Sequence, residues 1–499
     1  MLHLQQYYAN IVIVKMQEEI MRKLKKVKKI VSIALLASII SMNTMPVFAV
    51  EENAKASTAT PKQFKSMVSK NKKQKTSDDY KFAYINMNWW ENFNDDILTS
   101  YIQKAVINNY DLKMATLNVE EYYQNVKAQF ASELPSATGG FGPGWFKMPG
   151  STSTDINFGL PIIVQYEADI FLKNHNKTKA VKKLYEGSKQ DERAAYISIA
   201  SAVGSTYFNI INLDKMIELQ EQIVNIRQEI YDLMLASNKE GLTSTADTVK
   251  ANKALVQGQT DLIELKKNRE QMLHQLSVLI GESPENANSL ERNSLDSINY
   301  KLTVPSQIPS EIITHRPDYL KAELMVEKAG IDVKVAKKEF LPSINILGGA
   351  VFNAGDLGSL FTTKNMLLGL AGGIMAPLFQ GGSLIANLRL KKATYERILQ
   401  NYYKTNLTAI QEVNDALVAA KLDKDKMLQT EHQFNLEKED YKYSENKFDE
   451  GTISKLDLIQ YQENLLTIEK LVAQQKIECM TDAISLYKAT GSKPYDYVN

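Results

Sequence analysis

Apolar residues recur at three- and four-residue steps over most of the chain, and this spacing predicts helices. One helix is expected to follow Asp95, a possible helix cap, and to end before Pro135. The other predicted helices cover about 176–239, 246–280, 317–340, 383–450 and 454–490. Residues 383–450 contain no proline or glycine, so this helix would be about 100 Å long at 1.5 Å rise per residue. Helices of that length exceed a compact domain and are expected to pack side by side in coiled-coil fashion.

Two segments break the helical spacing and predict β-hairpins, at 137–168 and 343–380. Each is rich in glycine and follows a Leu-Pro-Ser stop. In the first hairpin, apolar side chains occupy every second position: Ile156, Phe158, Leu160, Ile162, Val164 and Tyr166. The stretch is as long as a tilted strand that crosses a bilayer, about 9–11 residues. A strand of a soluble sheet with one buried face alternates in the same way, so the pattern alone leaves both interpretations open. The second hairpin alternates less cleanly.

The chain contains an internal duplication. Ten residues between Asp111 and Ser136 recur between Asp318 and Ser343 at an offset of 207 positions. Two helix breaks also match, at an offset of 210 positions: Glu240-Gly241, Ser244, Asp247 and Leu255 correspond to Glu450-Gly451, Ser454, Asp457 and Leu465. Glycine permits the break, serine caps the next helix, and aspartate suits its first turn. Capping alone would explain both aspartates. We therefore predict two structural repeats, 85–300 and 301–499.

The N-terminal residues predict export from the cytoplasm. Met21–Lys29 is basic, Ile30–Ile40 is apolar, and Val47-Phe48-Ala49 resembles a cleavage site, so residues 1–49 predict a signal peptide whose true start could be Met21. The apolar part is shorter than the roughly 20 residues of a membrane helix. Residues 50–84 predict a flexible tail. No later stretch predicts a membrane helix, so the mature chain is either soluble or crosses a membrane as β-strands.

Composition and motifs exclude several functional classes. Charged residues make up 23% of the chain and the formal net charge is +1, which gives no global field for nucleic acid. The single cysteine, Cys479, excludes an intrachain disulfide framework and a cysteine zinc cluster, and its helical spacing predicts a buried hydrophobe. The five histidines lack metal-ligand spacing, and no phosphate loop or nucleophile elbow is present. We predict no enzyme activity, no cofactor and no metal site.

Several short motifs, in this order, resemble the TolC-like outer-membrane efflux proteins. They are Trp90 with Phe93 and Leu98, then 166–171 (Tyr-Glu-Ala-Asp-Ile-Phe), Arg316-Pro317-Asp318, and 377–382 (Pro-Leu-Phe-Gln-Gly-Gly). With the duplicated plan, the resemblance covers roughly 85–492. Among the branches of this family, the one that exports drugs has the sequence motifs most similar to these. Many members of that branch carry a lipid on an N-terminal cysteine, and no cysteine follows the predicted cleavage site here.

The resemblance implies a mostly α fold with membrane β-strands and a homotrimer. Each chain would give two β-hairpins to a shared barrel in outer-membrane lipid, and long antiparallel helices to an α-helical barrel across the periplasm. It implies a passive exit duct for drugs or other small molecules, or for type I secretion. The implied partners are a periplasmic adaptor and an inner-membrane pump of RND or ABC type. The alternative is a secreted coiled-coil scaffold, in which residues 137–166 and 344–379 would not enter a membrane.

The resemblance also implies roles for residues at the two helix breaks. Asp457 and Gln460 match the two positions that line the narrowest periplasmic ring, where relatives carry acidic residues. Asp247 matches a position in the links that close the helix tips, but Phe448 and Ile453 stand where some relatives have tyrosine and arginine. The adaptor is expected to dock on the tips, at Gly241, Ser244, Gly451 and Ser454. The exported substrate is not indicated.

Overall fold

A computed structural model describes residues 88–146, 155–298, 308 and 310–491, all within the compact unit Tyr80–Asn499. The predicted signal peptide and tail lie outside the described residues. The helices and 3-10 turns (η) are η4 Trp89–Phe93, α3 Asp96–Asn108, α4 Tyr110–Ala131, α5 Lys173–Lys239, α6 Thr245–Leu279, η5 Pro284–Ser289, η6 Leu295–Ser297, η7 Ser310–His315, α7 Pro317–Lys338, η8 Thr363–Asn365, α8 Ser383–Asp449 and α9 Lys455–Ala489.

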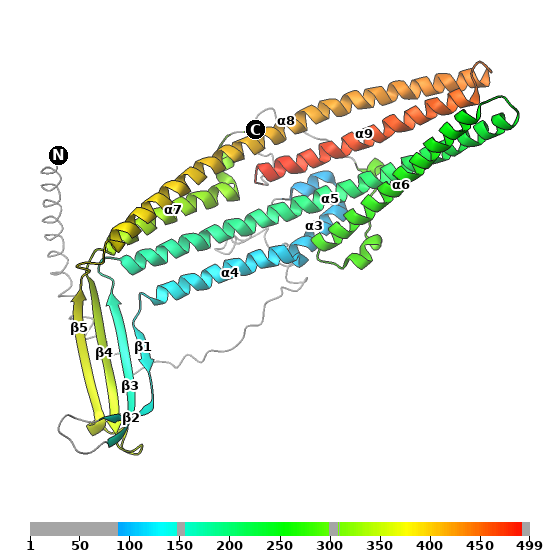
Figure 1. Ribbon diagram of the computed structural model, residues 1–499. Coiled ribbons are helices and arrows are strands. Elements are labelled where there is room, and N and C mark those ends of the chain that lie inside the picture. The colour runs from blue at the N-terminus through cyan, green and yellow to red at the C-terminus, as the bar shows by residue number, and fades with distance from the viewer. Residues whose placement is uncertain (1–87, 147–154, 299–307, 309, 492–499) are drawn as a thin grey trace, which may run out of the picture. The chain divides into compact units, whose positions relative to one another are not determined.

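The two repeats follow the same order of elements (Figure 1). A helix of 22 residues, α4 or α7, leads into strands, and a helix of 67 residues, α5 or α8, leads out of them. After a short turn, a helix of 35 residues returns alongside the long one, as α6 or α9. Equal lengths in the two halves follow from the duplication in the sequence.

The prediction of one continuous helix between Asp95 and Pro135 is wrong, because α3 ends at Asn108 and α4 begins at Tyr110. Asn109 between them has an extended ψ of 130°. Its Oδ1 accepts a hydrogen bond from the Leu112 N–H at 3.0 Å, and its Nδ2 donates to the Leu279 carbonyl at 2.9 Å. The asparagine side chain competes with the helical backbone, so it caps α4 and fastens the break to the end of α6.

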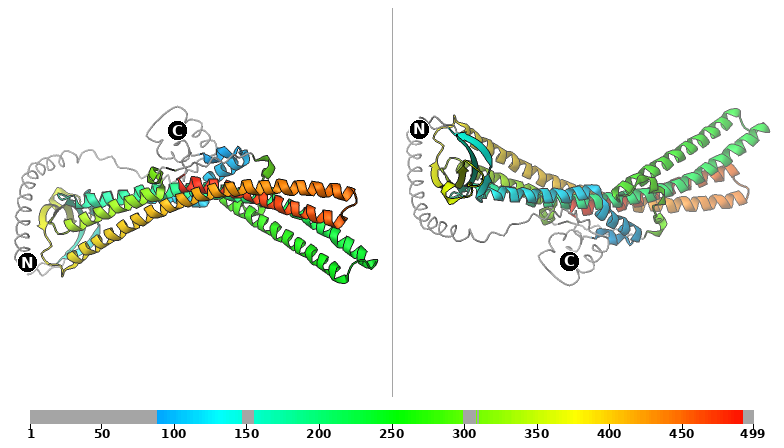
Figure 2. Two further views of the ribbon diagram at one scale, coloured as in Figure 1. Left: turned by 90° about the horizontal axis from the view of Figure 1, so that it is seen from above. Right: turned by 90° about the horizontal axis from the view of Figure 1, so that it is seen from below.

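The helices form two successive layers, one towards the helix tips at Gly241 and Gly451 and one towards the strands. Helix α5 lies in the interior of both layers. Towards the tips the packing order is α6–α5–α9–α8, and towards the strands it is α4–α5–α7–α8 (Figures 1 and 2). By length and composition α5 is apolar enough to cross a membrane, but 67% of its apolar window is buried. Packing inside the chain therefore accounts for this apolar stretch.

The main core lies where η4 and α3 pack on the middle of α5 and the end of α9. The Trp89 ring stacks on Tyr487 at a centroid distance of 5.6 Å. A Cβ on Gly204 of α5 would lie 2.8 Å from the Trp89 ring, so only glycine leaves room for that ring. Asp95 is the N-cap of α3, as predicted, and its Oδ2 accepts a hydrogen bond from the Tyr207 hydroxyl at 2.8 Å.

The strands form one antiparallel sheet, in the order β1–β3–β4–β5, with β2 also paired to β3. Their bounds are β1 Ser136–Gly139, β2 Gly142–Phe146, β3 Asp155–Ala168, β4 Ser343–Ala354 and β5 Met366–Met375. The two hairpins join through β3 and β4, where Leu160 lies opposite Phe352. The sheet has two open edges, one from each repeat: β1 and β2 form the first edge, and β5 forms the second. Neither edge has a neighbouring strand in the described chain.

Cys479 is buried on α9, 4% exposed, as its helical spacing predicted. Burial raises the pKa of its thiol to about 11. Nearby, burial and the neighbouring carboxylates of Asp423 and Glu478 together raise the pKa of Asp482 to about 7, against the opposing effect of Lys426. The α8–α9 contact therefore holds a carboxyl group that resists ionisation.

Asp482→Asn is expected to raise the melting temperature at pH 8 and to raise it much less at pH 5. An acid whose pKa is higher in the folded state loses stability as pH rises from its usual pKa through the raised value. Asparagine keeps the shape and never carries the charge. Thermal unfolding of both proteins across this range measures the difference. An equal gain at both pH values would show that ionisation of Asp482 is not the cause.

Candidate functional site

The two helix tips are built by the same turn. Gly241 and Gly451 have φ of 74° and 73°, in the left-handed region that favours glycine. The next N–H in each turn reaches back to the helix it leaves: Leu242 donates to the Ser237 carbonyl and Thr452 to the Lys447 carbonyl, both at 2.8 Å. This is the Schellman arrangement, which satisfies carbonyls at a helix end.

A serine then starts each return helix. The Ser244 Oγ accepts a hydrogen bond from the Asp247 N–H at 3.2 Å, and the Ser454 Oγ accepts one from the Asp457 N–H at 3.1 Å. At the second tip the Ser454 N–H also donates to Asp457 Oδ2 at 3.0 Å, which completes a capping box. Hydrogen bonds from the Ser454 hydroxyl and N–H lower the pKa of Asp457. The exposed carboxylate of Asp457 thus takes part in the cap of α9 and also carries a negative charge.

Asp247 and Gln460 lie together, although they come from different repeats. Both line a groove of about 430 Å³ between α5, α6 and α9, with Arg227, Lys250 and Glu463. Asp457 lies one turn earlier on α9 and does not line this groove. Phe448 packs under the Lys455 ammonium, with 5.8 Å from Nζ to the ring centroid.

Arg227 is a residue of this groove that the sequence analysis missed. Its guanidinium donates to Glu463 Oε1 of α9 at 2.9 Å and to the Ala254 carbonyl of α6 at 3.0 Å. A Cβ on Gly258 would lie 3.2 Å from this guanidinium, so the glycine leaves space for it. A mid-helix glycine costs about 1 kcal/mol relative to alanine, and Gly258 was the sequence signal for a close approach. Arg227 ties the two helical hairpins together.

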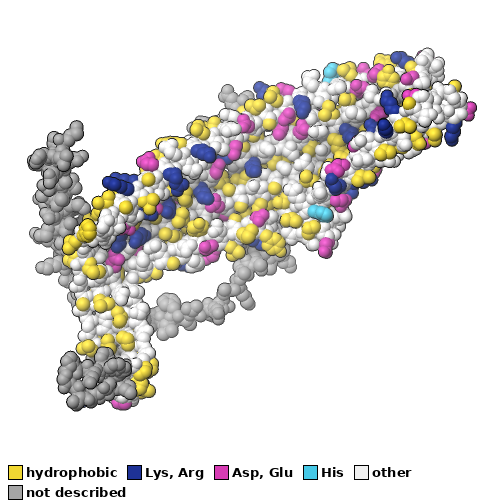
Figure 3. Space-filling view, viewed as in Figure 1, with side chains coloured by type: hydrophobic (Ala, Val, Ile, Leu, Met, Phe, Trp, Pro, Cys, Tyr) yellow, Lys and Arg dark blue, Asp and Glu magenta, His cyan; other side chains and the backbone are white. Residues whose placement is uncertain are grey.

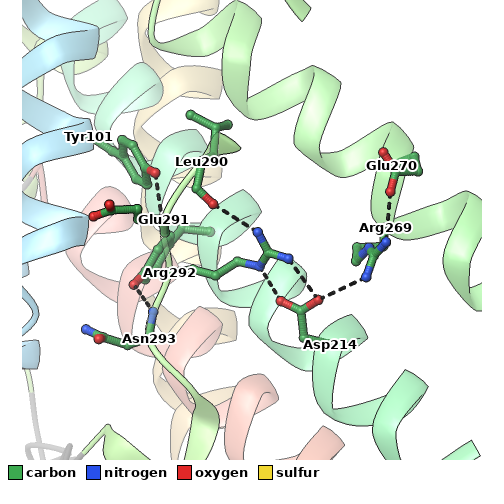
Figure 4. Close-up of polar contacts among 9 residues, drawn as sticks. Tyr101, Asp214, Arg269, Glu270, Leu290, Glu291, Arg292 and Asn293 are labelled. Atoms are coloured by element: carbon green, nitrogen blue, oxygen red, sulfur yellow. Dashed lines mark hydrogen bonds and ion pairs between the residues drawn. The ribbon is translucent and has the colours of Figure 1, made fainter. Parts of the chain in front are cut away.

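A second polar cluster holds the segment between the repeats (Figure 4). Asp214 of α5 pairs with Arg292 and with Arg269 of α6, and Arg292 also donates to the Leu290 carbonyl at 2.9 Å. The Tyr101 hydroxyl donates to the Glu291 carbonyl at 2.7 Å. Leu290 and Leu295 are buried in the main core. These contacts fix the segment that follows α6 on α5, and the sequence analysis did not foresee them.

The strand register extends the apolar face of β3 across the sheet. Leu160, Ile162, Val164 and Tyr166 lie opposite Phe352, Ala350, Gly348 and Ile346 of β4. These lie opposite Met366, Leu368, Leu370 and Gly372 of β5. Because opposite residues in antiparallel strands share a face, one face is entirely apolar or glycine over this width. The other face mixes the polar Asn157, Gln165, Asn345 and Asn353 with apolar residues such as Ile163, Leu347, Val351 and Leu367.

The predicted lipid-facing residues from Phe158 to Tyr166 are on this apolar face. Ile162 and Val164 are exposed, and Phe158, Leu160 and Tyr166 are half-buried. The side chain of Ile156 lies outside the described set. Between Phe158 and Tyr166, and throughout β4 and β5, no residue is charged. Figure 3 shows the same change of surface: the sheet between its two ends lacks the Lys, Arg, Asp and Glu that cover the helices.

Within the described ranges, no three or more His, Cys, Asp or Glu side chains come together in a way that could hold a metal ion.

Comparison with known proteins gives consistent matches. The family described as outer membrane efflux protein matches residues 101–282 and 308–492. The chain is 27% identical over 423 residues to the probable efflux pump outer membrane protein TtgC of Pseudomonas putida, covering 83% of this chain and 87% of that protein. It is 24% identical over 411 residues to the cation efflux system protein CusC of Escherichia coli, covering 82% and 89%.

A solved structure has the same arrangement. The Campylobacter jejuni CmeC outer membrane channel superposes with a TM-score of 0.76 at 25% identity, covering 82% of this chain and 88% of that chain. This likeness confirms the fold class predicted from the sequence.

Proposed function

Because the chain belongs to the outer membrane efflux protein family, we propose that it is a passive exit duct in the outer membrane. Three copies share one β-barrel in the membrane, and their helices form one tunnel across the periplasm. The duct performs no reaction and binds no cofactor. It exports drugs or other small molecules, driven by an inner-membrane pump of RND or ABC type that connects through a periplasmic adaptor.

The observation that carries this proposal is that the sheet and both helical layers each end, on both sides, in an element without a further neighbour in the described chain. The sheet is four strands wide and ends in β1 with β2 on one side and in β5 on the other. An open strand edge is not tolerated in lipid, because its N–H and C=O groups have no water to bind. Three copies joined edge to edge make a closed barrel of twelve strand positions.

The helical layers support the same ring. Near the strands the outer helices are α4 and α8, and near the tips they are α6 and α8. Both α6 and α8 expose apolar side chains along one stripe, including Val249 and Val256 on α6 and Leu436 and Tyr443 on α8. In each layer one edge comes from the first repeat and the other from the second. Head-to-tail contact would cover both stripes.

The apolar sheet face supports a membrane location. Its uncharged stretch, Phe158 to Tyr166 on β3, reaches the length a tilted strand needs to cross a bilayer, about 9–11 residues. A secreted scaffold would leave this wide face in water, where large apolar patches are unusual. We therefore favour the duct over the scaffold.

We assign the periplasmic entrance to the helix tips. Asp457 and Gln460 line the narrowest ring, and Asp247 lies beside Gln460 in the tip groove. The adaptor docks around Gly241, Ser244, Gly451 and Ser454, where a helical hairpin can add to the bundle. The Arg227–Glu463 contact, 2.7 Å at its shortest, ties the hairpins and must yield if the tips separate.

Asp457→Ala is expected to reduce cation selectivity several-fold and to weaken block by multivalent cations. Three carboxylates around one axis attract cations, as acidic rings do in cation channels. Single-channel recording of the mature chain in a planar bilayer measures both effects and also tests the duct itself.

Asp457→Asn is the matched variant, because its amide oxygen still accepts the Ser454 hydrogen bond without the charge. Both variants should lose selectivity alike. Normal selectivity in both would move the constriction away from Asp457, whereas a wild-type protein that never inserts would favour the scaffold.

A further inference from the structure

Positive charge gathers where the helices meet the sheet. Over 173–183, 334–338 and 389–397 the chain carries twelve Lys or Arg and one acidic residue, Glu396. We call these twelve the basic collar: Lys173, Lys177, Lys179, Lys182, Lys183, Lys334, Lys337, Lys338, Arg389, Lys391, Lys392 and Arg397. At the opposite end, residues 437–457 carry seven acidic residues and four lysines. The chain is nearly neutral as a whole, so the asymmetry is local.

Helix stability does not explain the basic collar. Lysines suit the end of α7, because cations stabilise a helix C-terminus. Helices α5 and α8, however, begin at this place, and cations are unfavourable near a helix N-terminus. Neither helix has an acidic residue in its first turn. What the three helix ends share is their position beside the sheet (Figure 1).

Most of this charge is not neutralised within the chain. Lys173 pairs with Glu167 at 2.7 Å, and Lys183 pairs with Glu186 and Glu327 at 2.8 Å. Within the described part of the chain, seven exposed members make no ion pair: Lys179, Lys182, Lys334, Lys337, Arg389, Lys392 and Arg397. Figure 3 shows Lys and Arg gathered on the helices next to the uncharged sheet.

A groove between α7 and α8 adds apolar surface to this charge. It measures about 810 Å³ and is lined by the apolar Val326 and Ile331 together with Lys334, Lys337 and Lys392. Glu327 and Glu396 also line it, and Glu327 is already paired with Lys183. Apolar walls next to several ammonium groups suit an amphipathic molecule that carries a phosphate group and an apolar part.

We propose that the basic collar binds the anionic headgroups of phospholipids in the periplasmic leaflet of the outer membrane. This inference rests on the proposed function, which puts the sheet in that membrane. Lysines near an anionic surface each add to the attraction, and their long side chains reach the headgroups while their stems stay on the protein. The collar would thereby fix the depth at which the sheet sits.

The test uses the full mature protein in nanodiscs that contain equal amounts of phosphatidylglycerol and phosphatidylcholine. The collar variant carries Lys179→Gln, Lys182→Gln, Lys334→Gln and Lys337→Gln. The control variant removes the same number of exposed, unpaired lysines far from the sheet, with Lys253→Gln, Lys421→Gln, Lys438→Gln and Lys442→Gln. The measured quantity is the ratio of the two lipids that stay bound to the protein after mild detergent extraction.

Wild type and control should retain phosphatidylglycerol in several-fold excess, and the collar variant should lose most of that excess. A basic residue near an anionic membrane contributes about a fivefold preference before salt screening, so high salt should weaken the enrichment. Channel recordings of all three proteins show that each has assembled.

Two results would overturn the proposal while leaving the duct intact. They are conducting wild-type channels without enrichment and an unchanged enrichment in the collar variant. If the second result came with an altered ion selectivity of that variant, it would place the lysines along the conduit. A wild-type protein that neither inserts nor conducts would overturn the proposed function itself and the collar with it.

Discussion

Leu160→Arg is expected to abolish assembly of the protein into the outer membrane. Leu160 lies within the uncharged stretch of β3 and on the apolar face, opposite Phe352 of β4. An arginine on the lipid face of a membrane strand costs about 2–4 kcal/mol near the midplane. A trimer would carry that cost three times in one barrel, which is a large part of the stability of an ordinary fold. The trimer in the membrane fraction, measured by native gel after detergent extraction, should disappear.

The matched control is Val351→Arg. Val351 lies opposite Pro161, next to the Leu160–Phe352 pair and therefore at nearly the same depth, but on the other face of the sheet. In a barrel whose apolar face meets lipid, this side chain points to the water-filled interior and an arginine is tolerated. Equal loss in both variants would indicate a general defect of the sheet, and normal assembly of Leu160→Arg would show that this face does not meet lipid.

The features that the sequence predicted are local ones. Helix lengths follow from apolar spacing and from the absence of proline and glycine between Ser383 and Asp449. The tips follow from glycine, serine and aspartate at fixed offsets, since capping needs only neighbours three residues apart. The apolar face of β3 follows from strict alternation. The duplication then makes every local signal appear twice.

The features that the sequence did not predict depend on distant partners. Arg227 and Glu463 are 236 residues apart, and Arg292 lies 78 residues from Asp214. An arginine on a helix surface looks the same in sequence whether it faces water or a second helix. The break at Asn109 was missed for a related reason, because apolar spacing continues through it and the asparagine is held by the Leu279 carbonyl of another helix. The residues of the basic collar can be read from the sequence, but only the structure shows that they gather beside the sheet.

Val256→Lys is expected to prevent formation of the trimer. Val256 is 53% exposed on α6, and Leu436 is 53% exposed on α8. Val256 follows Gly241 by fifteen residues, and Leu436 precedes Gly451 by fifteen, so the two lie at the same height above the tips. Val249 and Tyr443 match in the same way at eight residues. In a head-to-tail ring, α6 of one chain would therefore meet α8 of the next with both stripes in register.

A lysine at this contact would lose water without gaining a partner, a penalty of several kcal/mol per ion that is repeated at all three contacts. Light scattering in detergent should then give the mass of one chain. Circular dichroism should stay helical, because Val256 faces away from the buried side of α6 at Leu255. Leu436→Lys should have the same effect from the other side of the contact.

The double variant with Val256→Lys and Leu436→Glu separates a contact between chains from a simple loss of solubility or folding. If the two stripes meet, the opposite charges pair across each contact and part of the trimer returns, whereas Val256→Lys with Leu436→Lys stays monomeric. A favourable coupling is the signature of direct contact in a double-mutant cycle. Trimers that persist in Val256→Lys, or charges that never compensate one another, would mean that the α6 and α8 edges do not join and that the open layers are closed in some other way.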